Sequence, residues 1–268
     1  MTNTKTIKPW IYLSKKNNSK LRLFCFSYAG GSASTFSSWA NNIDSEVEIC
    51  PIELPGHGCR IAEQPFDQLE PLVEEITNAL LPYLEKPFAL FGHSMGGLVS
   101  FELAHLLRKK FNLSPEHLFI SGRRAPQIPD PRPPIHHLDK LKLINELGRL
   151  NGTPKAVLEN AELMELFLPV LRADFTTIET YIYKSKPLLD CSITVLGGLQ
   201  DDEVSCENLE AWQEQTNSNF SIQMFQGDHF FINSNRSTLL QFLNQELQKI
   251  VSKIDFSKYS GLHLDRGQ

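Results

Sequence analysis

The chain carries the segment Phe88-Ala89-Leu90-Phe91-Gly92-His93-Ser94-Met95-Gly96, in which a short apolar run leads into a G-x-S-x-G pentapeptide. The apolar run has the length of a short buried strand, and residues 98–110 have the pattern of a helix. A strand, a tight turn and a helix therefore follow one another, with the serine at the turn. Glycines suit positions 92 and 96 because side chains there would collide with the neighbouring strand or helix.

A G-x-S-x-G turn between a strand and a helix is typical of the nucleophile elbow of α/β-hydrolases. In that arrangement the serine hydroxyl projects above the sheet, at the positive end of the following helix. The same pentapeptide in an isolated loop would mean little, and the flanking strand and helix are what favour the elbow. The sequence therefore predicts Ser94 as a catalytic nucleophile.

Apolar runs alternate with helical patterns along most of the chain, as expected for βαβ units that build a mostly parallel sheet flanked by helices. A sheet of this kind places its site at the carboxyl ends of the strands. The fold class is therefore predicted to be α/β, with the α/β-hydrolase architecture. The predicted strands are 21–27, 47–52, 88–91, 117–121, 192–196 and 220–225, and the predicted helices between them include 68–84, 98–110 and 238–250.

The alternation fails between residues 127 and 186, where no strand-like run occurs. We interpret this stretch as a helical lid inserted into the sheet domain, so that residues 1–126 and 187–268 form the core. An ordinary set of surface helices is the alternative. The stretch has a proline-rich start and helical patterns at 139–149, 155–160 and 162–183, the last interrupted by Pro169.

Length, charge and cysteine content limit the remaining possibilities. A chain of 268 residues suits one α/β domain with an insertion. A net charge of −5 disfavours nucleic acid or an anionic membrane as a partner. No apolar run is long enough to span a bilayer, and residues 1–8 lack the apolar stretch of a signal peptide. The five cysteines form no C-x-x-C pair and are interpreted as mostly buried thiols, which predicts a cytoplasmic protein.

A serine hydroxyl needs a general base, usually histidine, and an acid that orients the base. In α/β-hydrolases these residues follow in the order Ser, Asp, His. Asp201 and Asp202 follow the fifth predicted strand, and His229 follows the sixth. Sequence order alone does not choose between the two aspartates, whereas Asp228 is poorly placed because it adjoins the histidine. No His or Cys spacing indicates a metal site.

Acyl transfer also requires an oxyanion hole. One donor is expected to be the backbone N–H of Met95, the residue after the nucleophile. The other is predicted to be the N–H of Ala29, in the glycine-containing loop 28–32 that follows the first predicted strand. A phosphate-binding loop is disfavoured because no G-K-[ST] follows these glycines.

Five segments together resemble one family, the type II thioesterases that accompany nonribosomal peptide and polyketide synthases. The similarity runs from about residue 21 to residue 240. It departs from the family pattern at Leu199 and Asp202, and His57 stands where the family usually has arginine. The five segments are 26–33 (FSYAGGSA), 53–60 (ELPGHGCR), 91–97 (FGHSMGG), 168–175 (LPVLRADF) and 227–231 (GDHFF).

The resemblance implies a hydrolase that removes acyl groups from the phosphopantetheine arms of acyl or peptidyl carrier domains. It implies Asp201 as the triad acid, and no metal or organic cofactor beyond the phosphopantetheine of the substrate. It also implies that the helical lid covers the serine, so Phe167, Leu171 and Phe175 are candidate acyl-pocket residues, although packing of the lid explains each equally well. A local basic patch is expected for carrier docking, with Arg123, Arg124 and the run 108–110 (RKK) as candidates, and an ordinary solvated face is the alternative. The protein is expected to be a monomer.

Two other enzymatic readings stay open at this stage. A general α/β-hydrolase acting on a small free ester, amide or peptide would use the same triad. An acyltransferase would pass the acyl group to an alcohol or amine instead of water. A binding protein that keeps the fold without the chemistry is disfavoured because serine, histidine and acid are all present.

Overall fold

A computed structural model of the chain describes residues 9–13 and 18–255, so residues 1–8, for which no signal peptide was predicted, lie outside it. Its centre is a parallel sheet of six strands in the order β2-β1-β3-β4-β5-β6. All six predicted strands are present, with ends that differ from the prediction by two residues at most. The strands are β1 (Leu21–Phe26), β2 (Val47–Pro51), β3 (Phe88–His93), β4 (His117–Ser121), β5 (Ser192–Gly198) and β6 (Phe220–Phe225).

Side chains of each strand alternate between two apolar layers, because successive residues of a strand point to opposite faces. In β1, Leu23 and Cys25 belong to one layer, whereas Phe24 and Phe26 belong to the other. Every residue of β1 is buried, and its residues are apolar except Arg22, which is paired with Glu48 and Glu85. The sheet is therefore covered on both faces, as the predicted fold class requires.

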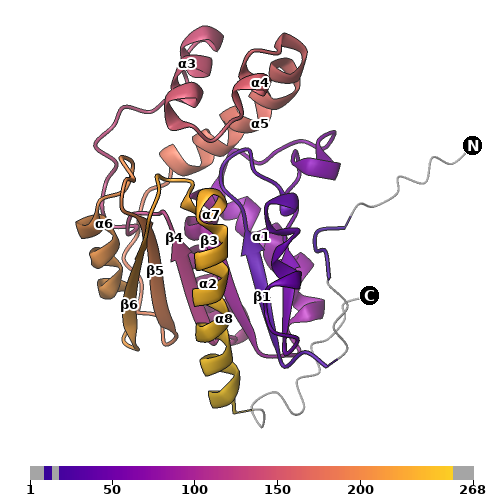
Figure 1. Cartoon of the computed structure of the whole chain (residues 1–268), viewed down its shortest axis with the longest axis vertical. Helices are drawn as coiled ribbons and strands as arrows, with labels where there is room; N and C mark the ends of the chain where they lie inside the picture. The colour runs from indigo at the N-terminus through magenta and orange to yellow at the C-terminus, as the bar shows by residue number, and fades with distance from the viewer. Residues whose placement is uncertain (1–8, 14–17, 256–268) are drawn as a thin grey trace, which may run out of the picture.

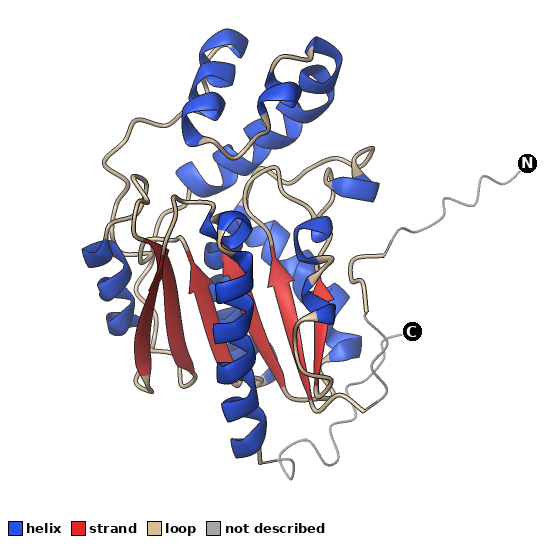
Figure 2. Cartoon of the chain, in the orientation of Figure 1, coloured by secondary structure: helices blue, strands red, loops and turns tan. Residues whose placement is uncertain are grey.

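Helices cover both faces of the sheet (Figures 1 and 2). The layer of Phe24 includes buried residues of α1 (Leu69–Leu80) and α2 (Met95–Phe111). The layer of Leu23 includes buried residues of α8 (Arg236–Lys253). The described residues contain no helix that is both long and apolar enough to span a membrane. Short helices complete these layers: α6 (Cys206–Glu210), α7 (Phe231–Ser234), η1 (Ala33–Phe36), η2 (Trp39–Asn41), η3 (Gly58–Arg60), η4 (Leu81–Tyr83) and η5 (Ala211–Gln215).

Residues 127–186 lie between β4 and β5 and contain α3 (Lys140–Leu150), α4 (Lys155–Leu158) and α5 (Ala161–Glu179). We call this segment the helical insert. Figures 1 and 2 show it above the carboxyl ends of the strands. It has an apolar cluster of its own, formed by Ile135, Leu143, Leu147, Met164 and Leu171.

Pro169 does not interrupt α5, contrary to the sequence-based expectation. The helix continues through it from Ala161 to Glu179. A proline inside a helix costs about 3 kcal/mol, because it lacks an N–H and crowds the preceding turn. Buried residues on both sides of the proline, Met164 before it and Val170 and Leu171 after it, offset this cost through their packing.

Candidate active site

Ser94 lies at the sharp turn between β3 and α2 with φ of 53° and ψ of −113°, a strained backbone conformation for a residue with a side chain. Both glycines of the pentapeptide are required by close packing. A Cβ at Gly92 would lie 2.0 Å from the carbonyl oxygen of Gly96, and a Cβ at Gly96 would lie 2.2 Å from that of Phe26. The turn therefore has the geometry predicted for a nucleophile elbow.

His229 lies in the loop after β6 and is hydrogen-bonded to Asp201, which follows β5. The distance from His229 Nδ1 to Asp201 Oδ2 is 2.8 Å. The other carboxylate oxygen, Oδ1, accepts the backbone N–H groups of Glu203 at 2.8 Å and Val204 at 3.1 Å. Only 1% of the Asp201 side chain is exposed. Because Nδ1 faces a carboxylate, the imidazole keeps Nε2 free for the cavity that His229 shares with Ser94.

The structure distinguishes Asp201 from the two other acids near it in sequence. Asp202 is exposed and has no hydrogen bond to His229 within the described residues. Asp228 points elsewhere: its carboxylate accepts the N–H of Phe230 at 2.9 Å and the side-chain amide of Asn151 at 3.1 Å. Asp201 is therefore the acid that the fold brings to His229.

The two expected oxyanion donors are the backbone N–H groups of Ala29 and Met95. Met95 is the first residue of α2, so its N–H has no partner inside the helix. Ala29 lies in residues 28–32, which we call the oxyanion loop, and it lines the same cavity as Ser94. In the part of the chain that the structure describes, neither N–H meets a protein acceptor. Both groups are free to bind a carbonyl oxygen.

His93, which sequence reasoning did not single out, packs directly beside His229. Its ring is fully buried, the two ring centroids are 5.1 Å apart, and its Nδ1 is 2.9 Å from the hydroxyl of Ser121. Burial, together with the adjacent His229, lowers the pKa of His93 well below its usual value. His93 is therefore a neutral packing surface for the His229 ring.

A cavity of about 1080 Å³ lies between the sheet and the helical insert. Ser94 and His229 line it, and so do Leu171 and Phe175 of α5. Phe167 does not line the cavity and instead packs in the apolar cluster of the insert, so its assignment to the pocket is corrected. The spacing of Phe167, Leu171 and Phe175 places them on one face of α5. Phe167 nevertheless lies about 12 Å from Phe175 along the helix axis, and this separation puts it beyond the cavity.

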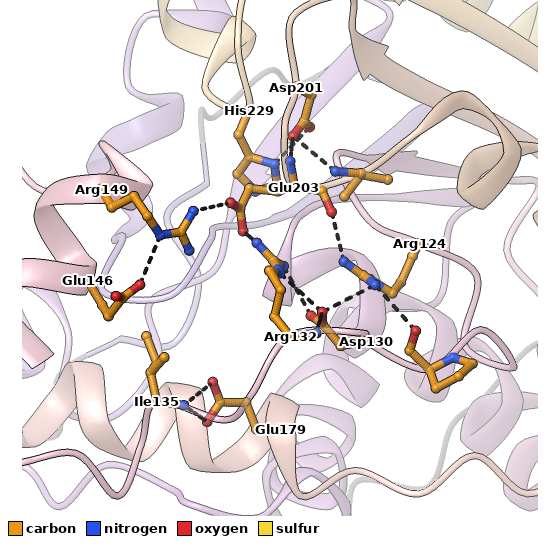
Figure 3. Close-up of polar contacts among 12 residues, drawn as sticks. Arg124, Asp130, Arg132, Ile135, Glu146, Arg149, Glu179, Asp201, Glu203 and His229 are labelled. Carbon is orange, nitrogen blue, oxygen red and sulfur yellow. Dashed lines mark hydrogen bonds and ion pairs between the residues drawn. The ribbon is translucent and has the colours of Figure 1, made fainter.

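Figure 3 shows a network of charges at the edge of this cavity that no sequence motif revealed. Glu203 forms ion pairs with Arg132 and with Arg149, whose Nη1 is 3.0 Å from the carboxylate. Its backbone carbonyl accepts a hydrogen bond from Arg124 at 2.7 Å, and its N–H donates to Asp201. The network therefore joins the turn that carries Asp201 to the helical insert.

The expected docking patch does not form at Arg124. That side chain is 6% exposed and is paired with Asp130 at 3.3 Å. Arg123 differs, because it lines the cavity and its buried Nε–H meets no acceptor among residues 9–13 and 18–255. Burial, with Arg124 next to it, lowers the pKa of Arg123 to about 10. Arg123 is thus a cation at the wall of the cavity, with one buried N–H that no described residue accepts.

Metal-binding clusters and reactive cysteine thiols among the described residues would indicate other chemistry. No cluster of three or more His, Cys, Asp or Glu side chains there could hold a metal ion. None of the five cysteines forms a disulfide within the described residues, and three of them, Cys25, Cys50 and Cys191, are buried. Burial is the main reason that the pKa of the Cys191 thiol is raised to about 12, so it is not an activated nucleophile.

A six-stranded parallel sheet that carries a strained serine elbow and a histidine–aspartate pair beyond its last strands defines the class of α/β-hydrolases. Comparison with known proteins is more specific. The model of the thioesterase domain family matches residues 21–247. The chain belongs to this thioesterase family and is a thioester hydrolase.

Relatives and solved structures narrow the family further. The gramicidin S biosynthesis protein GrsT of Aneurinibacillus migulanus is 44% identical over 253 residues, which cover 94% of this chain and 99% of that protein. RedJ, a thioesterase from the prodiginine biosynthetic pathway in Streptomyces coelicolor, has a TM-score of 0.81 and 39% identity, with 86% of this chain and 88% of that chain covered. YbtT, a type II thioesterase from the yersiniabactin NRPS/PKS pathway, has a TM-score of 0.80 and 29% identity, with 90% and 99% covered. The resemblance to type II thioesterases is confirmed.

Proposed function

We propose that this thioesterase hydrolyses acyl groups from the phosphopantetheine arms of carrier domains in a nonribosomal peptide or polyketide synthase, as an editing enzyme. The observation that carries the proposal is that the strained Ser94 and His229 line one cavity under the helical insert. In addition, His229 is hydrogen-bonded to Asp201. The pathway names of the relatives supply the class of synthase. We further propose a cytoplasmic monomer whose partners are these carrier domains.

The proposed reaction has two halves. Ser94 Oγ attacks the thioester carbonyl while His229 Nε2 takes the hydroxyl proton, and Asp201 stabilises the imidazolium through its bond to Nδ1. The N–H groups of Ala29 and Met95 bind the oxyanion. The C–S bond then breaks, and His229 returns the proton to the leaving thiol. Water, deprotonated by the same histidine, hydrolyses the acyl-Ser94 ester by the reverse proton movements. Every group in this scheme belongs to the chain or to the substrate, so the proposal includes no metal and no cofactor.

Polar groups of the cavity favour a substrate with a long polar arm over a small free ester. The guanidinium of Arg123 lines the cavity, and its Nε–H has no acceptor in the described part of the chain. The pantetheine arm has amide carbonyls and a phosphate, which are good acceptors for such a group. Leu171 and Phe175, by contrast, give the cavity an apolar wall suited to an acyl chain.

The proposed function is tested by comparing one acyl group on two leaving groups. Acyl-phosphopantetheinyl carrier protein is expected to exceed the p-nitrophenyl ester of the same acid in kcat/KM by about two orders of magnitude or more, because remote binding energy lowers the barrier. The Ser94→Ala variant supplies the background rate. Equal kcat/KM for both substrates would favour a general esterase, and acyl transfer to an added amine or alcohol would favour an acyltransferase.

Phe175 is expected to set the preference for acyl size. Replacing it with alanine enlarges the apolar wall of the cavity, so kcat/KM for long relative to short acyl groups should rise by about tenfold. The ratio is measured with a series of acyl-pantetheine thioesters. Phe167→Ala is the matched control, since it removes the same side chain from the same helix outside the cavity. An equal shift in both variants would mean that loosening of α5, and not the wall at Phe175, changes the preference.

A further inference from the structure

A buried ion pair outside the Ser94–His229–Asp201 group joins the helical insert to the oxyanion loop. His57 lies in the turn after β2, and Asp174 lies on α5, 117 residues later in the chain. Their side chains are 3% and 4% exposed, and His57 Nε2 is 2.9 Å from Asp174 Oδ2. The same carboxylate oxygen accepts the backbone N–H of Gly30 at 2.7 Å. Asp174 therefore bonds simultaneously to His57 and to the residue next to Ala29.

The surroundings of the His57 ring favour its doubly protonated form. Nε2 faces the carboxylate of Asp174, and Nδ1 is 3.0 Å from the carbonyl oxygen of Pro55. A carbonyl and a carboxylate can only accept hydrogen bonds, so both ring nitrogens must donate. A neutral imidazole carries one N–H and would leave a lone pair facing one of the two oxygens. The geometry therefore indicates an imidazolium.

The carboxylates around His57 also favour its protonated form. Asp174 of α5 and Glu53, from the segment just after β2, are the carboxylates that act on it. Arg60, the cation of the same turn, is engaged by Glu63 and stacks on the ring of Trp10 at 4.0 Å. Burial alone would lower the pKa of His57, but Asp174, the Pro55 carbonyl and Glu53 outweigh burial and raise it.

Two buried carboxylates hold the backbone that follows Ala29. Asp174 binds the N–H of Gly30, and Glu53 binds the N–H of Ala33 at 3.0 Å. Leu171, one turn before Asp174, packs closely over Gly30. A Cβ atom added to Gly30 would lie 2.5 Å from Cδ2 of Leu171. One face of α5 therefore sets both the packing and the hydrogen bonding at Gly30, directly beside the proposed oxyanion donor.

We propose that His57 is a positioning residue whose positive charge keeps Asp174 bonded to Gly30 and thereby fixes the N–H of Ala29 in the oxyanion hole. This inference rests on the proposed function in one respect, namely that the N–H of Ala29 binds the oxyanion. As an imidazolium, His57 balances the buried charge of Asp174. When His57 loses its proton, the carboxylate is left without a counter-charge and one ring nitrogen repels its neighbour. The link between α5 and the oxyanion loop then weakens.

The direction of the pH effect follows from the raised pKa of His57. The stabilisation by the ion pair is fully present below the pKa of an unfolded histidine and is lost as pH rises through the higher folded value. The wild-type enzyme should therefore lose kcat on the alkaline side as His57 deprotonates.

The test compares pH profiles of kcat for the wild type, His57→Gln and His57→Arg. Glutamine can donate to Asp174 but carries no charge, so kcat should fall about tenfold at neutral pH, and the alkaline fall attributed to His57 should vanish. This loss is smaller than the about 10²–10³ expected when an oxyanion donor is removed outright. Arginine keeps a charge at all pH values used, so it should restore kcat and also lack the alkaline fall. An alkaline fall that persists unchanged in both variants would overturn the proposal.

A matched control and a direct measurement keep the test decisive. His117→Gln changes another buried histidine, the first residue of β4, whose ring is hydrogen-bonded to the hydroxyl of Thr194 in β5. This variant should leave the shape of the pH profile unchanged. If His57→Gln does not fold, NMR of the His57 ring in the wild-type protein still reports its protonation. A neutral ring at pH 6.5 would refute the imidazolium. All rates are measured with a free p-nitrophenyl ester and with the carrier substrate, so absence of a carrier preference counts against the proposed function alone.

Discussion

Replacing Ser94 with alanine is expected to lower kcat for thioester hydrolysis by about four to six orders of magnitude. Among the described residues, Ser94 is the serine of the elbow that lines the cavity, and no other cavity-lining residue of that part of the chain has its strained backbone geometry. Binding of the acyl-carrier substrate should persist, because the apolar wall and Arg123 are unchanged. The measurement is single-turnover hydrolysis of acyl-carrier protein, together with labelling of the enzyme by a fluorophosphonate, which should disappear.

Two further variants separate loss of chemistry from loss of structure. Ser100→Ala removes another buried serine of α2, whose hydroxyl has no hydrogen-bond partner among the described residues, and should retain full activity. Ser94→Gly should be as inactive as Ser94→Ala but more stable by about 1 kcal/mol, since glycine adopts the positive φ of this position without strain. Fluorophosphonate labelling that survived in Ser94→Ala would place the nucleophile elsewhere in the chain.

Local patterns predicted the parts of this structure that depend on local interactions. The apolar runs matched all six strands because the strands of a parallel sheet covered on both faces are rich in apolar residues. The elbow was recognisable because the approach of Gly92 to the backbone of Gly96 and of Gly96 to that of Phe26 leaves no room for a side chain. The choice of Asp201 over Asp202 needed the family resemblance. Its physical basis is that the N–H groups of Glu203 and Val204 hold the carboxylate toward His229.

Contacts between distant segments could not be predicted in this way. Helical spacing placed Phe167, Leu171 and Phe175 on one face, but only the docking of α5 determines which part of that face lies over the serine. The pairs His57–Asp174 and Arg149–Glu203 join residues 117 and 54 positions apart, and neither has a local signature. The docking patch was misjudged at Arg124 for the same reason, because its guanidinium donates a hydrogen bond to the backbone carbonyl of Glu203, 79 residues later in the chain.

Asp201→Asn is expected to lower kcat by about 10⁴-fold with little change in KM. An asparagine keeps the shape of the aspartate, and its amide oxygen can still accept the N–H groups of Glu203 and Val204. The amide nitrogen would then face His229 Nδ1 and donate to it, which places the imidazole proton on Nε2. A base protonated on the nitrogen that should receive the proton of Ser94 cannot activate the serine. The fall in kcat is measured with the same acyl-carrier substrate.

Asp202→Asn is the matched control, since it makes the same chemical change one residue away at an exposed position. It should leave kcat within about twofold of the wild type, because surface substitutions away from a specific contact have small effects. Asp228→Asn tests the third acid: it removes a charge that contacts Phe230 and Asn151 but not the imidazole ring, so a modest effect on loop stability is expected. A large loss in Asp202→Asn with activity retained in Asp201→Asn would mean that the turn after β5 rearranges when substrate binds, because in the structure the carboxylate within hydrogen-bonding distance of His229 is that of Asp201.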